Sequence, residues 1–218
     1  MRMTRLFLAG LLCAATLPAS ASAQRTRDFE DSWFWGVKGG VSAFSPVYGD
    51  SETAATFGAE WLITRTHGAL YVSVDQSNVN AVSAVYDPTA EGSVRAVEVD
   101  KLRRVGFAAL MFPKKFGHVR PYAGLGLSLN LIGDAYPLLA PEEEDGDVTD
   151  AVYERIDDRK SQASLLGMGG VQIQFGRAGV FGQASFMPSN SHFLLDEGLA
   201  FFEFGVRYNF GGAREGIR

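Results

Sequence analysis

The segment PSNSHFLLDEG brings together the residue types that nucleophilic catalysis uses. Ser189 and Ser191 carry hydroxyls and are followed directly by His192. Asp196 or Glu197 could orient the imidazole, as the acid does in a Ser/His/acid triad. Such a triad needs a rigid scaffold, whereas this segment has no strand or helix pattern. We therefore interpret these side chains as polar residues of a loop.

Charged residues at alternating strand positions form a second candidate site. Eight of them fall on the face opposite the aromatic and aliphatic side chains: Lys38, Glu60, Asp75, Glu98, Asp100, Arg104, Glu203 and Arg207. A single charge on a buried face is costly, so we expect these acids and bases to pair across the interior. The pattern favours a polar network that fills and rigidifies the protein. A narrow ion path lined by the same groups is the alternative, and it needs the same residues.

An acidic run in residues 134–160 is the third candidate. Its DGDVTD stretch has oxygen ligands at spacings that Ca²⁺ could use, but the later bidentate Glu of a full calcium loop is missing. Because a run of like charge is usually solvated, we predict an exposed acidic loop at 138–158 and no metal site. Such a loop could bind a partner, or contact a phosphate-bearing surface through bridging cations. Arg103 could pair directly with a phosphate of the same surface.

The elements that position these residues are alternating strands. In residues 199–210, Phe202, Phe204 and Val206 share one face, and Glu203 and Arg207 share the other. A small and charged face suits the crowded inside of a narrow barrel, and an aromatic face suits lipid. Similar stretches lie near residues 33–44, 54–65, 69–77, 96–112, 121–133, 162–175 and 179–187.

The connections between these stretches alternate in length. Those after the first, third, fifth and seventh are roughly 9, 18, 28 and 11 residues, and the others are roughly 3 to 8. An antiparallel barrel with short turns on one side of a membrane and longer loops on the other has this pattern. Eight strands enclose an interior that side chains can fill, so we expect a packed lumen.

The N-terminal residues predict export. Arg2 and Arg5 precede a short apolar run, and residues 21–23 (Ala-Ser-Ala) form a small-residue cleavage site before Gln24. The single cysteine, Cys13, lies in the segment that would be removed, and Leu12 before it argues against a lipoprotein. Disulfides and thiolate metal sites are therefore excluded from the mature chain. Its net charge would change from −5 to −7, because two arginines and no acids are lost, which argues against a nucleic-acid partner.

Aromatic residues near strand ends form a further pattern. We expect an aromatic girdle that anchors the barrel at both membrane interfaces, made of Trp33, Trp35, Trp61, Tyr208 and Phe210. Tyr71 and Tyr122 alternate inwards and are expected to fill the lumen.

The signal, the eight strands and the segments RPYAGLGLSLN and FEFGVRYNF resemble the small outer-membrane β-barrel family, the OmpA/OmpX-like proteins of Gram-negative bacteria. Unlike that family, which commonly ends on the last strand's aromatic residue, this chain continues beyond Phe210 for eight residues. Some barrels of this size deacylate lipid A and place a His two residues before a Ser-Asn pair. Met187 occupies that position here, so the motif is broken.

The sequence thus predicts an all-β protein: an eight-stranded antiparallel transmembrane β-barrel with an up-and-down meander. The expected organisation is a signal peptide (1–23), a barrel (24–210) and a short C-terminal tail (211–218). The resemblance implies a monomer of the bacterial outer membrane in contact with lipid, lipopolysaccharide and the outer-membrane assembly machinery. We expect no catalysis and no cofactor, with a structural, envelope-stabilising or adhesive role. A narrow channel for ions or small solutes and a lipid A-modifying enzyme are the alternatives.

Overall fold

The structure is a computed structural model that describes residues 29–46, 51–88, 90–114, 116–138, 147–188 and 193–212. The predicted signal peptide, the acidic residues 139–146 and the end of the tail lie outside the described residues. The elements, in chain order, are β1 (Ser32–Pro46), β2 (Glu52–Thr64), β3 (Gly68–Tyr86), the 3-10 turn η1 (Glu91–Ser93), β4 (Val94–Met111), β5 (Val119–Ile132), β6 (Ala135–Pro137), α2 (Asp147–Asp158), β7 (Ser161–Phe175), β8 (Ala178–Met187) and β9 (Leu195–Gly212).

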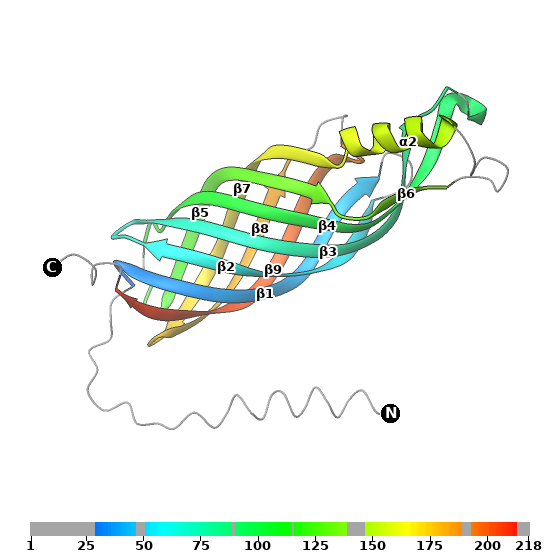
Figure 1. The fold of residues 1–218 in the computed structure, drawn as a ribbon. Helices are drawn as coiled ribbons and strands as arrows, with labels where there is room; N and C mark the ends of the chain where they lie inside the picture. The colour runs from blue at the N-terminus through cyan, green and yellow to red at the C-terminus, as the bar shows by residue number, and fades with distance from the viewer. Residues whose placement is uncertain are drawn as a thin grey trace, which may run out of the picture.

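Eight long antiparallel strands close into a barrel (Figure 1). Each long strand pairs with its neighbours in the sequence, and β1 pairs with β9 to close the ring. The short strand β6 pairs only with β4, beyond the end of β5. The meander order is the simplest way to connect antiparallel neighbours, because each connection joins adjacent strands. No helix among the described residues has the length and apolar character needed to cross a membrane.

The strands form because their side chains alternate between two environments. In β9, Phe201 is fully buried, whereas Phe202 and Phe204 are 51% and 70% exposed. Leu125 and Leu165, on β5 and β7, are 76% and 68% exposed. Water would make so large an exposed apolar surface unfavourable, and lipid would not. The barrel is therefore apolar outside and mostly polar at mid-height inside.

Inward-facing glycines allow the strands to curve around so narrow an interior. A Cβ on Gly40 would lie 2.0 Å from the carbonyl oxygen of Phe202, and one on Gly126 would lie 1.8 Å from that of Phe107. Real Cβ atoms do not come this close to a carbonyl, so any larger residue would push the neighbouring strand away.

The two ends of the barrel differ as the connection lengths predicted. At the turn end, residues 65–67, 112–118 and 176–177 join strands, and Gly117 and Gly176 have φ of +61°. At the loop end lie the longer connections. There β3 runs nine residues further than expected, because Val79, Ala81, Ser83 and Val85 continue its inward-facing alternation.

Residues 147–158 form a helix, which corrects the expectation of a loop through 138–158. Val152 and Ile156 of α2 are fully buried in the same apolar cluster as residues at the loop end of the lumen. Arg155 donates a hydrogen bond to the Tyr86 carbonyl at 3.1 Å. The helix forms because one apolar stripe of the acidic segment can dock against the barrel. The part of β3 after Asn78 pairs with the part of β4 before Lys101. Together with α2 and β6, these residues make an extension beyond the barrel (Figure 1).

Candidate functional site

The centre of the lumen holds a four-residue charge cluster. The Lys38 ammonium lies 3.0 Å from Asp75 and 3.0 Å from Glu203. The Arg104 guanidinium lies 2.6 Å from Asp75 and 2.8 Å from Glu203. All four side chains are almost fully buried. Two cations and two carboxylates therefore neutralise one another, and each charge that leaves water gains partners.

A second ion pair lies beside this cluster, towards the turn end. Arg207 donates to Glu60 through Nε and to Gln172 through Nη1, the latter at 2.8 Å. Its Nη2 approaches the Tyr122 hydroxyl at 3.3 Å, and its guanidinium lies 3.8 Å from the Phe181 ring centroid. A charge-assisted bond together with aromatic stacking suits an arginine removed from water.

Neutral side chains join the two groups into one network. The Tyr71 hydroxyl accepts from Lys38 at 2.9 Å and from Gln183 at 3.1 Å. Gln183 also donates to Glu203 at 3.0 Å and accepts from Tyr122 at 2.9 Å. The network therefore has at least one member on each of the eight long strands: Lys38, Glu60, Tyr71, Asp75, Arg104, Tyr122, Gln172, Gln183, Glu203 and Arg207.

Two of the eight predicted lumen charges lie elsewhere. Glu98 is exposed on the outer face, and Asp100 is half-buried, because the alternation of β4 changes phase between Val99 and Leu102. At the same height, the register with β3 shifts between Asn78 and Ala81. The expectation that Glu98 and Asp100 face inwards is therefore corrected, whereas the other six predicted residues come together in the lumen.

A buried ion pair in the extension was missed by the sequence reasoning. Arg95 Nε donates to Asp87 at 2.6 Å, and both side chains are at most 5% exposed. Arg155 of α2 lies 3.7 Å from the same carboxylate. The sequence signal was the continued alternation of residues 79–85, which extends β3 to Tyr86 and so places Asp87 directly after the strand.

Apolar side chains close the lumen at its loop end. The largest of them are fully buried: Phe193, Leu194, Leu195, Leu199, Phe201, Met187 and Leu102. The Ser83 hydroxyl donates to the Leu194 carbonyl at 2.5 Å, which holds the segment before β9 against β3. A hydrated ion passing this layer would lose its water without gaining polar partners.

Aromatic residues close the turn end. Phe29 is 3% exposed, and its ring lies 4.7 Å from that of Phe112 and 5.5 Å from that of Phe34. The Thr64 hydroxyl fastens this segment by donating to the Phe29 carbonyl, and it accepts from the Ser32 amide at 3.1 Å. The mouth is therefore plugged by Phe29, which lies just before β1, packed against Phe34 and Phe112.

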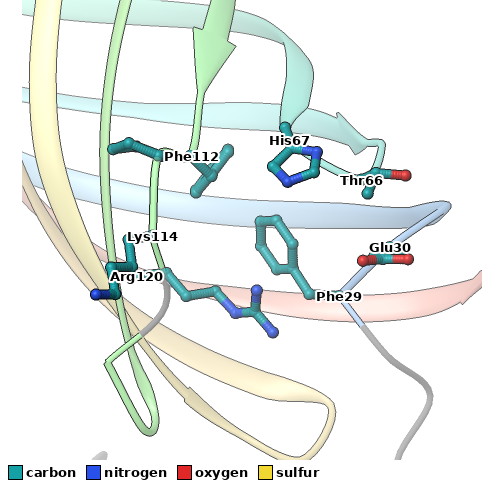
Figure 2. Close-up of a pocket in the computed structure, with 8 residues that line it drawn as sticks. Phe29, Glu30, Thr66, His67, Phe112, Lys114 and Arg120 are labelled. Carbon is teal, nitrogen blue, oxygen red and sulfur yellow. The ribbon is translucent and has the colours of Figure 1, made fainter.

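A shallow pocket of about 360 Å³ lies at this mouth (Figure 2). Phe29 and Phe112 form its apolar part, and the Arg120 guanidinium lies 4.3 Å from the Phe29 ring centroid. The polar groups around it are Glu30, Thr66, His67, Lys114 and Arg120. These side chains are at least partly exposed, so the pocket is an open vestibule over the plug.

The predicted aromatic girdle occupies one end of the barrel. The Trp61 ring lies 5.5 Å from Trp35 and 5.4 Å from Trp33, and Tyr208 lies 5.1 Å from Phe210. Trp35 also pairs across strands with both Trp61 and Tyr208. All five therefore belong to the turn end, which corrects the expectation that they mark both interfaces. Tyr71 and Tyr122 are buried inside.

The candidate catalytic segment lies largely outside the described residues, which exclude 189–192 as well as the side chains of Asp196 and Glu197. Met187, at the position of the deacylase histidine, is fully buried in the apolar layer. His67 and His118 lie in turns at the opposite end of the barrel. Among the described residues, no group of three or more His, Cys, Asp or Glu side chains could hold a metal ion.

No family model and no curated protein matches the chain. Nineteen chains of solved structures match it, among them the following two. The crystal structure of Neisserial surface protein A (NspA) matches with a TM-score of 0.53 and 15% identity, over 82% of this chain and 97% of that one. The structure of Ail, the attachment invasion locus protein of Yersinia pestis, matches with a TM-score of 0.51 and 12% identity, over 84% of this chain and 100% of that one. The predicted fold is confirmed: this chain has the fold of the small eight-stranded transmembrane β-barrels.

Proposed function

We propose that the chain is a non-enzymatic integral protein of the Gram-negative outer membrane with a structural or adhesive role. Export by residues 1–23 would deliver it to the periplasm, where the outer-membrane assembly machinery would insert it as a monomer. The turn end, with its girdle and the last described residues of β9, would face the periplasm, and the extension would face outwards.

The sealed lumen is the observation that carries this proposal. Its charges are neutralised by one another, and apolar layers that include Phe29 and Phe201 lie above and below them. A conducting pore needs polar groups that remain available to water and ions. A barrel filled in this way has its outer surface and its extension left for function.

The extension supports an adhesive role. Its outward side chains include Val82, Tyr86, Tyr136, Leu138 and Tyr153, which are between 40% and 58% exposed. Exposed tyrosines supply large contact areas that lose little conformational entropy on binding. The attachment invasion locus protein, which has the same fold, carries a name that supports the same reading.

The outer edge of the apolar band supports contact with lipopolysaccharide. Arg103 and Lys101 point outwards from β4, beyond Val105 and Phe107. Lys101 pairs with Asp134, whereas the Arg103 guanidinium is exposed at the height of Gln76. A lipopolysaccharide phosphate at this level would be within reach of the planar Arg103 guanidinium, which can donate two hydrogen bonds to it.

The membrane assignment is tested by running the mature chain, folded in detergent, on SDS gels with and without boiling. A band that migrates differently without boiling, together with β-type circular dichroism only in detergent, is the expected result. A soluble protein that folds without detergent and is insensitive to boiling would instead favour a periplasmic lipocalin-like binder.

Planar-bilayer recordings separate the sealed barrel from a narrow channel. The folded protein should give no stable single-channel steps, because the charged side chains are paired and both ends of the lumen are closed. Reproducible steps whose ion selectivity changes in Glu203→Gln would refute the sealed lumen and favour the channel.

The adhesive role is tested on whole cells. Combined Tyr86→Ser and Tyr136→Ser changes should reduce binding to host surfaces or to a purified partner. Phe116→Ser is the matched control, because Phe116 is also an exposed aromatic residue but lies in a turn that would face the periplasm. Equal binding by the wild type and both variants would contradict the adhesive role and favour the structural one.

The enzyme alternative is tested by mass spectrometry of lipid A, with and without the protein. The lipid A species should be identical, and a lost acyl chain would favour the enzyme.

A further inference from the structure

Two glycines on the outer face of β7 have no explanation inside the barrel. A Cβ on Gly167 would have its nearest neighbours at 3.9 Å, and one on Gly169 would have its nearest at 3.6 Å, which are ordinary contacts. Neither glycine has a positive φ. Gly40 and Gly126 differ, because a Cβ there would collide with backbone. Glycine weakens a strand, so its use at 167 and 169 suggests that something outside the barrel approaches closely.

Gly169 has small neighbours on both adjacent strands, Ala123 on β5 and Ala184 on β8. Gly167 lies between two large exposed side chains, Leu125 on β5 and Phe186 on β8. The outer surface is therefore recessed at each glycine. The surface of β9 and β1 carries Phe202, Phe204, Trp33 and Trp35. The apolar groove on that side, beside Trp35 and Val206, is smaller, at about 420 Å³.

An apolar groove of about 620 Å³ begins at Gly167 and runs over β7, β5 and β4. Ala109, Ala123 and Gly167 form its floor, and Met111 and Leu125 project as its walls, 63% and 76% exposed. The groove lies within the apolar band and therefore opens towards lipid. Its turn end reaches Pro113.

A positive charge follows the end of the groove in the chain. Pro113 lines both the groove and the vestibule, and the next residue, Lys114, lines the vestibule. Lys114 is exposed, with its ammonium 5.5 Å from the Phe116 ring centroid. In the described part of the chain Lys114 has no carboxylate partner. An ammonium at the boundary of the apolar band is where a lipid phosphate would lie.

We infer that this groove binds one acyl chain of a periplasmic-leaflet phospholipid, with the lipid phosphate against Lys114. The inference rests on the proposed function, because it requires the barrel to span the outer membrane. A flexible chain can follow a recess with projecting walls, whereas a second barrel is convex and would touch Met111 and Leu125 before it reached the floor. Gly167 deepens the groove so that the acyl chain gains dispersion contacts on three sides.

The test uses phosphatidylglycerol that carries a photoreactive diazirine on one acyl chain, mixed at low fraction into phosphatidylethanolamine vesicles with the folded protein. Peptide mapping should find the adducts concentrated in β4, β5 and β7. In Gly167→Leu, which fills the groove, the adducts there should fall at least about tenfold. Gly39→Leu is the matched control, since Gly39 also faces outwards with its nearest Cβ neighbour at 3.6 Å, and it should label like the wild type. Lys114→Glu should weaken labelling, because it places a like charge against the phosphate.

Adducts spread evenly around the barrel, or unchanged labelling in Gly167→Leu, would overturn the inference. A dimer band on the unboiled gel that disappears in Gly167→Leu, with no lipid adducts at the groove, would also overturn it and would assign the surface to a second copy. The unboiled gel band is recorded for every variant. If the wild type lacks the unboiled gel band, the membrane assignment itself is refuted. If the band is normal and the lipid adducts are spread evenly around the barrel, only the lipid site is refuted.

Discussion

Removing the Arg207 guanidinium should destabilise the barrel strongly. Arg207→Met leaves the Glu60 carboxylate buried without its cation, and the Glu60 side chain is only about 1% exposed. Its Oε2 already lacks a hydrogen-bond partner within the described residues. Loss of one member of such a buried pair costs about 3–5 kcal/mol, because the remaining charge is uncompensated. The free energy of unfolding should fall by that amount.

The neutral double variant should recover much of this loss. Glu60→Gln alone leaves Arg207 as an uncompensated buried cation, although Gln172 still accepts a hydrogen bond from it. In Glu60→Gln with Arg207→Met neither charge remains. The double variant should therefore cost about 2–3 kcal/mol less than the sum of the two single changes, which is the coupling expected for directly contacting buried groups.

The assay is urea unfolding of the four proteins in lipid vesicles, followed by tryptophan fluorescence and by the unboiled gel band. Equal slopes of unfolding free energy against urea would show that the same surface is exposed in each case. If the single costs add to within about 0.5 kcal/mol, the two side chains are energetically independent. The interpretation of the lumen as a charge-balanced network would then be wrong.

Three further outcomes are expected. Gly40→Ala should abolish the folded gel band, because its Cβ would lie 2.0 Å from a carbonyl oxygen, whereas Gly39→Ala should fold and gain about 0.5 kcal/mol. Beyond the apolar band, the hydrogen bond from Lys101 lowers the pKa of Asp134, and the same bond raises the pKa of Lys101. The stabilisation from this depressed carboxyl is therefore present at neutral pH and is lost as pH falls through the shifted pKa. In a carboxyl NMR titration, Lys101→Met should move the Asp134 midpoint upwards, and an unmoved midpoint would contradict the pairing. Ile156→Asp should undock α2 and make it sensitive to trypsin on intact cells, while the gel band persists; resistance equal to the wild type would show that α2 is held by other contacts.

Period-2 alternation accounts for most of what the sequence predicted correctly. Lys38, Glu60, Asp75 and Arg104 each lie in a strand whose aromatic or aliphatic residues fix which face is outside, so their inward direction could be read locally. Their partners could not. Glu60 and Arg207 are 147 residues apart in the sequence, and only closure of the ring brings them into contact.

The errors arose where a strand departs from regular geometry. Glu98 was expected inside because the alternation of β4 was counted without interruption. The register shift opposite Asn78 and Ala81, where Asn80 has a φ of +47°, leaves no clear sequence signature. The helix α2 was hidden by its acidic residues, although Val152 and Ile156 have the helical spacing that buries them.

The lumen network has a consequence for how this barrel reaches one structure. A slip of one residue in the pairing of any strand would turn that strand's network member towards lipid. Because every one of the eight long strands contributes at least one member, each possible slip would break a buried hydrogen bond or ion pair and also place a polar group in hydrocarbon. The alternation of apolar residues already opposes such slips, and the buried charges add a free-energy penalty that a slipped barrel cannot relieve locally.

The central ion pairs join four strands across the interior. Lys38 and Arg104 each contact both Asp75 and Glu203, which links β1, β3, β4 and β9. The charges that left a narrow ion path open as the alternative are, on this argument, what specifies the register of a closed barrel. The surfaces that we propose for binding, the extension and the groove, both lie outside the lumen.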